Sequence, residues 1–137
     1  MILGRNDLAL RLVNRTGISA YQIDVLDGKK YCPTYDEVAV MLLKTNFEKY
    51  KYKNDVRDCD KFAVMLWGFV IQHFFDNPEW EYGWAFGLAL GKFQHTGGVR
   101  HALNFAFTQD RDLIFPEPQN DHIYLHDGHD RCDRLCC

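Results

Sequence analysis

The sequence contains no long hydrophobic run and no excess of positive charge, and each absence excludes a class of protein. No stretch approaches the ~18 consecutive apolar residues of a membrane-spanning helix. The opening MILGRNDLALRL lacks the long apolar segment and small-residue cleavage site of a signal peptide. A net charge of -3 argues against a general nucleic-acid binder. We therefore expect a cytoplasmic protein without nucleic-acid or membrane partners. The oligomeric state stays open.

The composition is that of one folded domain. Apolar residues make up 47% of the 137 residues and aromatic residues 15%, which is enough to bury a core. The five cysteines are an odd number, so at least one stays unpaired in a monomer. In a reducing cytoplasm we expect thiols rather than a disulfide framework. We divide the chain into a single domain at 1–120 and a polar tail rich in His and Cys at 121–137.

Hydrophobic periodicity predicts two helices followed by a hairpin. Residues 32–50 are typical of a helix, with Thr34 and Glu37 spaced as a capping box. Residues 59–75 carry an apolar stripe at helical spacing, after Asp58 as the N-cap. Strands are expected at 18–26, 82–93, 99–108 and 113–118. This order predicts an α+β fold with helices packed on a small antiparallel sheet.

One cysteine stands where its chemistry would be favoured. Cys59 lies in the first turn of the second helix, where free backbone N–H groups and the helix dipole favour a thiolate. His101 shares a strand face with Leu103, Phe105 and Phe107, which we expect to point toward that helix. A turn near 109–110 brings Glu117 close to His101 across the hairpin. A carboxylate there can hold an imidazole that accepts the proton of a thiol.

Three sequence blocks carry a family resemblance: CDKFA (59–63), HALNFAF (101–107) and EPQ (117–119). Together they resemble papain-like cysteine proteases. The closer likeness is to the protease domain at the C-terminus of a mushroom agglutinin and to small phage and bacterial proteins. The resemblance covers about 50–119.

That resemblance implies a papain-like core and a cysteine hydrolase that cleaves an amide bond in a protein or peptide through a thioester acyl-enzyme. Cys59 would be the nucleophile, His101 the base and Glu117 the orienting acid. Calcium is an implied cofactor, and carboxylates near Cys59 could bind it, namely Asp55, Asp58 and Asp60. Asn54 stands nearest to the place of an oxyanion donor, where papain-like enzymes keep a glutamine.

Simpler interpretations stand beside these predictions. Cys59 could be a small core residue. His95, on a glycine-rich loop, is a rival base. The tryptophans Trp67, Trp80 and Trp84 are expected in the core or in a cleft wall. The segment 121–137 is best read as a flexible polar terminus, although its spacing of His126, His129, Cys132 and Cys136 resembles a zinc site.

Three functional hypotheses therefore remain. The first is a cysteine hydrolase, for which protease, amidase, deamidase and transglutaminase chemistry are all open. The second is an inactive papain-like relative that acts as a phage-type binding protein, in which case it would act in the host cytoplasm. The third is a small zinc-binding domain organised by the tail.

Overall fold

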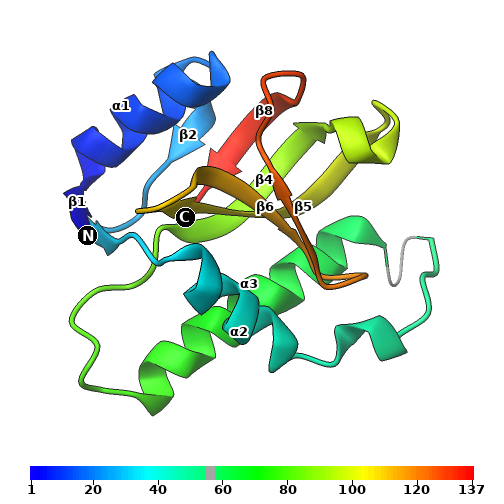
Figure 1. The fold of residues 1–137 in the computed structure, drawn as a ribbon, viewed down its shortest axis with the longest axis horizontal. Helices are drawn as coiled ribbons and strands as arrows, with labels where there is room; N and C mark the ends of the chain where they lie inside the picture. The colour runs from blue at the N-terminus through cyan, green and yellow to red at the C-terminus, as the bar shows by residue number, and fades with distance from the viewer. Residues whose placement is uncertain (55–57) are drawn as a thin grey trace.

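A six-stranded sheet in the order β2-β8-β4-β5-β6-β7 forms the centre of the protein in the computed structural model, which describes residues 1–54 and 58–137 (Figure 1). The strands are β2 (Ile23–Asp24), β4 (Phe86–Lys92), β5 (Arg100–Thr108), β6 (Asp112–Glu117), β7 (His122–Leu125) and β8 (Arg131–Cys136). β2 and β8 are parallel, and every other neighbouring pair is antiparallel. A separate two-stranded sheet joins β1 (Ile2–Gly4) to β3 (Lys29–Tyr31).

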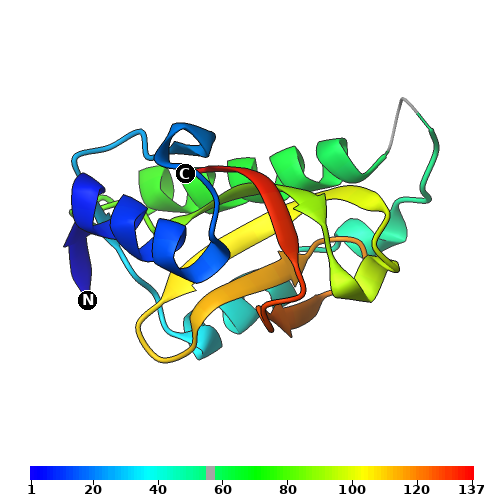
Figure 2. The same cartoon turned by 90° about the horizontal axis from the view of Figure 1, so that it is seen from above.

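The helices cover both faces of the large sheet. They are α1 (Arg5–Thr16), α2 (Tyr35–Leu43) and α3 (Cys59–Asp76), and short 3₁₀ turns occur at Ala20–Gln22, Phe47–Lys49 and Gln94–Thr96. In Figure 1 the strands lie between α1, drawn in blue, and the pair α2 and α3, drawn in cyan and green. Figure 2 shows α3 running along the sheet on the side away from α1.

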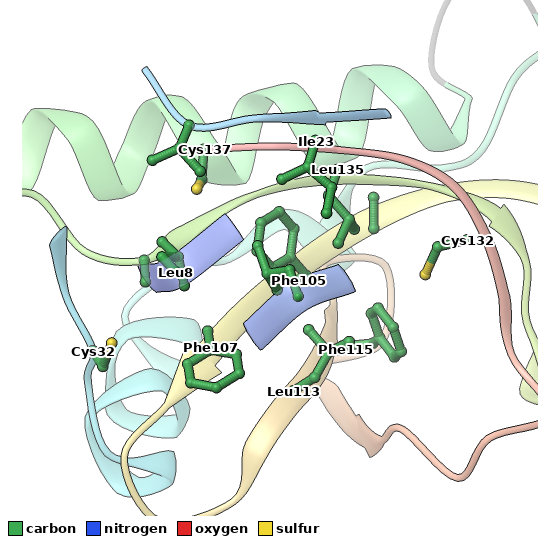
Figure 3. Close-up of a cluster of buried hydrophobic side chains, with 14 of the residues drawn as sticks. Leu8, Ile23, Cys32, Phe105, Phe107, Leu113, Phe115, Cys132, Leu135 and Cys137 are labelled. Carbon is green, nitrogen blue, oxygen red and sulfur yellow. The ribbon is translucent and has the colours of Figure 1, made fainter. Parts of the chain in front are cut away.

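Each face of the sheet has its own core. Leu8 and Leu12 of α1 pack with side chains of the sheet that include Leu103, Phe105 and Phe107. Figure 3 shows Leu8, Phe105 and Phe107 in this cluster. Leu66 and Val70 of α3 pack with α2 on the other face, against side chains that include Phe86, Ala106 and Ile114. The expectation that helix 59–75 covers the face of Leu103, Phe105 and Phe107 is therefore wrong. β5 is buried on both faces, so its alternation does not say which helix covers which face.

The two predicted helices are present, with different ends. α2 begins after Thr34, whose hydroxyl accepts a hydrogen bond from Glu37 N at 3.1 Å. Glu37 Oε2 in turn accepts from Thr34 N at 2.6 Å, so the capping box is confirmed. α2 ends at Leu43, however, rather than continuing to residue 50. α3 begins at Cys59 as predicted, and Phe62, Ala63, Leu66 and Val70 of its stripe are buried.

The predicted papain-like arrangement of helices on a small antiparallel sheet is corrected, because the sheet is larger and of mixed direction. α1 was missed within the opening segment. Its signals are Leu8 and Leu12 four residues apart, with Gly17 as a left-handed C-cap at φ 73°. Residues 122–125 and 131–136 form β7 and β8, and β8 lies inside the sheet. The prediction of a flexible terminus was therefore wrong over these two stretches.

Within the described residues, no helix combines the length and the apolar character needed to cross a membrane.

Candidate functional site

Two of the three predicted catalytic side chains meet in the structure. His101 Nε2 lies 2.7 Å from Glu117 Oε2, which is hydrogen-bonding distance. Glu117 is buried at 4% exposure, and the backbone N–H of Gln119 donates to its other oxygen at 3.3 Å. Since Nε2 faces the carboxylate, Nδ1 is the ring nitrogen left for another partner. The hairpin expected from the sequence therefore placed these two residues correctly beside each other.

The rival base His95 belongs to the same cluster. Its Nε2 lies 3.8 Å from the same Glu117 oxygen that bonds His101. The ring stacks on Tyr124 of β7, with centroids 3.6 Å apart and planes 6° from parallel. Burial lowers the pKa of His95, although the Glu117 carboxylate acts in the opposite direction. The neutral form of His95 is therefore favoured beside the His101–Glu117 pair.

Cys59 lies at the first residue of α3 and is partly exposed. Over residues 1–54 and 58–137, no hydrogen bond joins its sulfur to the His101 ring. Asn54 is exposed in the segment before α3. The assignment of catalytic roles to Cys59, His101 and Glu117, and of an oxyanion role to Asn54, stays a prediction.

The carboxylates predicted to bind calcium do not form a metal site among the described residues. Lys61 Nζ lies 3.1 Å from Asp58 Oδ1 and 3.1 Å from Asp60 Oδ1, so both carboxylates pair with a cation at the helix start. Asp55 lies outside the described residues. In the described part of the chain, no group of three or more His, Cys, Asp or Glu side chains is placed to hold a metal ion. A calcium requirement stays a prediction.

Two of the four tail residues proposed for zinc, His126 and Cys132, lie buried in the fold. His126 Nε2 lies 3.0 Å from the carbonyl oxygen of Arg15, and His126 Nδ1 lies 3.3 Å from Asp130. Cys132 is buried, and burial raises its pKa to about 12. Since zinc binds the thiolate, burial works against Cys132 as a ligand.

A second site is a cavity of about 330 Å³ that is lined by aromatic side chains and shares no residue with the His101–Glu117 cluster. We call it the aromatic pocket. Its lining residues come from β1, β3, the start of α2 and the loop between α3 and β4: Ile2, Tyr31, Glu37, Trp80, Glu81, Tyr82 and Trp84. Trp80 and Trp84 stack with centroids 5.5 Å apart and planes 15° from parallel. The sequence left core and cleft wall open for the tryptophans, and Trp80 and Trp84 line this pocket, Trp84 with only 5% of its surface exposed.

Backbone pairing fixes the shape of this pocket. Tyr31 N donates to Gly83 O at 2.9 Å, and Ala85 N donates to Tyr31 O at 2.7 Å, so the end of the loop is tied to β3. Tyr31 Oη bonds both oxygens of Glu37 at 3.1 Å. Burial, followed by the Glu37 carboxylate, raises the pKa of Tyr31, which keeps its proton on the hydroxyl. The pocket therefore presents two indoles beside a carboxylate whose position is fixed.

Comparison with known proteins identifies structural relatives. No known family matches the chain, and no curated protein matches it by sequence. One similar solved structure is titled the PSL1a-E64 complex, with a TM-score of 0.80 and 18% identity. Another is Polyporus squamosus lectin bound to the human-type influenza-binding epitope Neu5Aca2-6Galb1-4GlcNAc, with a TM-score of 0.78 and 18% identity. Each covers 96% of this chain, which spans about half of their length, 48%.

These findings correct the family and function predicted from the sequence. The relatives are a lectin in two complexes, and neither name describes a papain-like protease. The predictions of a thiol protease or other cysteine hydrolase, of a protein or peptide substrate, and of an inactive papain-like binding protein were therefore wrong. They depended on three short sequence blocks, each of them unspecific alone. At 18% identity the relatives show the fold, and a function for this chain has to be argued from its own residues.

Proposed function

We propose that this chain binds carbohydrate, and that the aromatic pocket is the sugar site. The observation that carries the proposal is the pair of nearly parallel indoles of Trp80 and Trp84, 5.5 Å apart, in a cavity that also holds Glu37 and Glu81. The structural relative bound to an oligosaccharide epitope supports this choice of ligand class.

The chemistry of the pocket suits a sugar ring. One side of a pyranose is formed by C–H groups, which pack on the electron-rich face of an aromatic ring. Its hydroxyl groups donate hydrogen bonds, and the carboxylate of the exposed Glu81 is a strong acceptor. The volume of about 330 Å³ lies at the small end of the roughly 300–1,000 Å³ typical of ligand sites, which suits one small unit.

Charge selects among sugars. The described lining residues include two glutamates and no cationic side chain. Lys29 lies nearby, with its Nζ 5.8 Å from the Tyr82 ring centroid. A ligand carboxylate in the pocket would meet two like charges. We therefore expect neutral units such as galactose or N-acetylglucosamine to bind better than N-acetylneuraminic acid.

The test is a titration of the purified protein with galactose, N-acetylglucosamine and N-acetylneuraminic acid, followed by tryptophan fluorescence and calorimetry. Trp80→Leu should weaken binding about fivefold or more, because aromatic contacts contribute about 1 kcal/mol beyond burial. Trp67→Leu, on α3 outside the pocket, is the matched control. Glu81→Gln should also weaken binding, whereas its exposed neighbour variant Glu79→Gln should not.

Thermal unfolding of each variant checks that the fold is intact. Absence of saturable binding by any of the three sugars would sink the proposal. Equal affinities of Trp80→Leu and the unchanged protein would remove the aromatic pocket as the site. A cytoplasmic location is also a proposal here, supported by five free cysteines.

A further inference from the structure

Three cationic side chains stand in one row across three neighbouring strands. Lys92 of β4 is the register partner of Arg131 on β8 and of Arg100 on β5. Register partners point to the same face of a sheet, with Cβ atoms roughly 4.5–5.5 Å apart. Like charges placed directly opposite each other destabilise the pairing. Such a row costs stability unless a negative charge compensates it.

Only the Arg100 end of this row of cations has a carboxylate nearby in the described structure. Arg100 Nε lies 3.5 Å from Asp133 Oδ2. Lys92 and Arg131 have no carboxylate within ion-pair distance among residues 1–54 and 58–137. Two neighbouring cations are therefore left without a counter-charge.

The backbone holds these two cations together. The register between β4 and β8 shifts between Leu90 and Gly91, which is the pattern of a β-bulge. A Cβ on Gly91 would stand 2.2 Å from Arg131 O, so glycine permits the close approach of β8 at this point. Bulges commonly re-aim side chains beside functional sites.

The same two cations line an open cavity of about 360 Å³. His129 and the loop residues Gly97 and Gly98 also line it, and in the described chain its lining includes no acidic side chain. The glycines have φ values of 67° and 74°, and a Cβ added to either would meet nothing within 4 Å. The loop therefore leaves room for a ligand, and the lining residues differ from those of the aromatic pocket.

We propose that this cationic pocket binds an oxyanion, such as a phosphate or sulfate group. The planar guanidinium of Arg131 can bond two oxygens at once, and the ammonium of Lys92 adds a point charge. His129 Nδ1 lies 3.6 Å from Asp127 Oδ1, so Nε2 is the ring nitrogen that can donate to the oxyanion from the rim. The ligand removes the repulsion across the strand pair. Its source is either a free inorganic ion or an ester on a larger molecule such as a sulfated sugar.

The experiment is a ¹H–¹⁵N NMR titration of the full chain with sodium phosphate and sodium sulfate, with sodium chloride at matched ionic strength as reference. The amides of Gly97 and Gly98 should shift saturably with phosphate or sulfate and not with chloride. Lys92→Gln and Arg131→Gln should each weaken binding at least tenfold. Arg11→Gln, on the exposed side of α1, should leave it unchanged.

Galactose 6-sulfate beside galactose distinguishes the two sources. Tighter binding of the ester than of inorganic sulfate identifies a sulfated ligand, and equal binding identifies the free ion. Thermal unfolding gives a second readout: phosphate should raise the midpoint of the unchanged protein but not that of Lys92→Gln. Chloride producing the same shifts, or Lys92→Gln retaining full affinity, would overturn the proposal. The phosphate and sulfate titrations do not depend on sugar binding at the aromatic pocket, so they test this proposal even if that binding fails.

Discussion

At the scale of single residues, the five cysteines differ in their environments. Cys32, Cys132 and Cys137 are buried, and burial raises their pKa values to about 11, 12 and 12. Burial also raises the pKa of Cys136. Cys59 is partly exposed in the first turn of α3. Since the thiolate is the reacting form, the burial that protonates the other four thiols should leave the partly exposed Cys59 as the most reactive.

We predict that iodoacetamide at neutral pH alkylates Cys59 at least tenfold faster than any other cysteine. The other four thiols are held protonated by burial, and three of them are out of reach of the reagent in the folded protein. Mass spectrometry of digested samples taken over time gives the five rates. Cys59→Ser is the control, which should abolish the fast phase. Similar rates at all five sites would contradict the structural account.

His95 should make stability depend on pH. Its folded pKa lies below the ordinary value of 6.5, so the unfolded chain binds more protons near that pH. The stabilisation is complete above about 6.5 and is lost as the pH falls toward the folded pKa. His95→Phe keeps a ring against Tyr124, and we expect its free energy of unfolding to fall less between pH 7 and pH 5.

Urea unfolding at several pH values measures this difference. His129→Gln is the matched control, because the His129 side chain is 76% exposed and should leave the profile unchanged. If the free energy of unfolding of His95→Phe falls more between pH 7 and pH 5 than that of the unchanged protein, the predicted direction of the His95 effect is wrong.

The pairing of His101 with Glu117 illustrates what residue patterns can predict. A short turn and two-residue alternation bring the two positions together, and the side chains are hydrogen-bonded at 2.7 Å. The aromatic pocket was predicted less fully. Trp80 and Trp84 were expected in the core or in a cleft wall, and Tyr31 and Glu37 reach the pocket through pairing of distant segments, which local patterns do not encode.

At the scale of elements, α2 and α3 were predictable because their signals are local. The capping box of α2 lies within four residues, and the buried stripe of α3 repeats every turn. β8 carries no such signal. Its sequence RCDRLC alternates weakly, and burial of Cys132 and Leu135 comes from strands far away in the chain. The charged residues of this segment favoured a loop in the sequence-based prediction. In the structure, pairing with β2 and β4 makes the segment a strand.

The contact between β4 and β8 depends on a glycine. A Cβ on Gly87 would stand 1.8 Å from the backbone oxygen of Cys136. We predict that Gly87→Ala destabilises the protein by about 3 kcal/mol or prevents folding, because backbone atoms on both strands must move. Urea unfolding followed by circular dichroism measures the change.

The matched control is Gly68→Ala on the exposed side of α3, where nothing lies within 4 Å of the added methyl group. It should stabilise the protein by about 0.5–1 kcal/mol, since alanine favours helix over glycine. Equal stability of Gly87→Ala and the unchanged protein would show that β8 is not held as closely as the structure describes.

At the scale of the whole molecule, the sequence order suggested helices followed by a hairpin sheet, and the strand order is different. β8 pairs in parallel with β2, although more than 100 residues separate Ile23 from its partner Leu135. Periodicity describes which side of an element is apolar, but not which distant element covers it. The place of β8 between β2 and β4 was therefore beyond prediction from local patterns.

The place of β8 between two strands that are synthesised earlier has a consequence for synthesis. While the chain leaves the ribosome from its N-terminal side, β2 and β4 emerge long before the strand that belongs between them. Their facing edges carry unpaired backbone groups that invite wrong partners. The edges of β2 and β4 must stay unpaired until Arg131–Cys136 has been synthesised, and chaperone binding during that interval would protect them from wrong pairing.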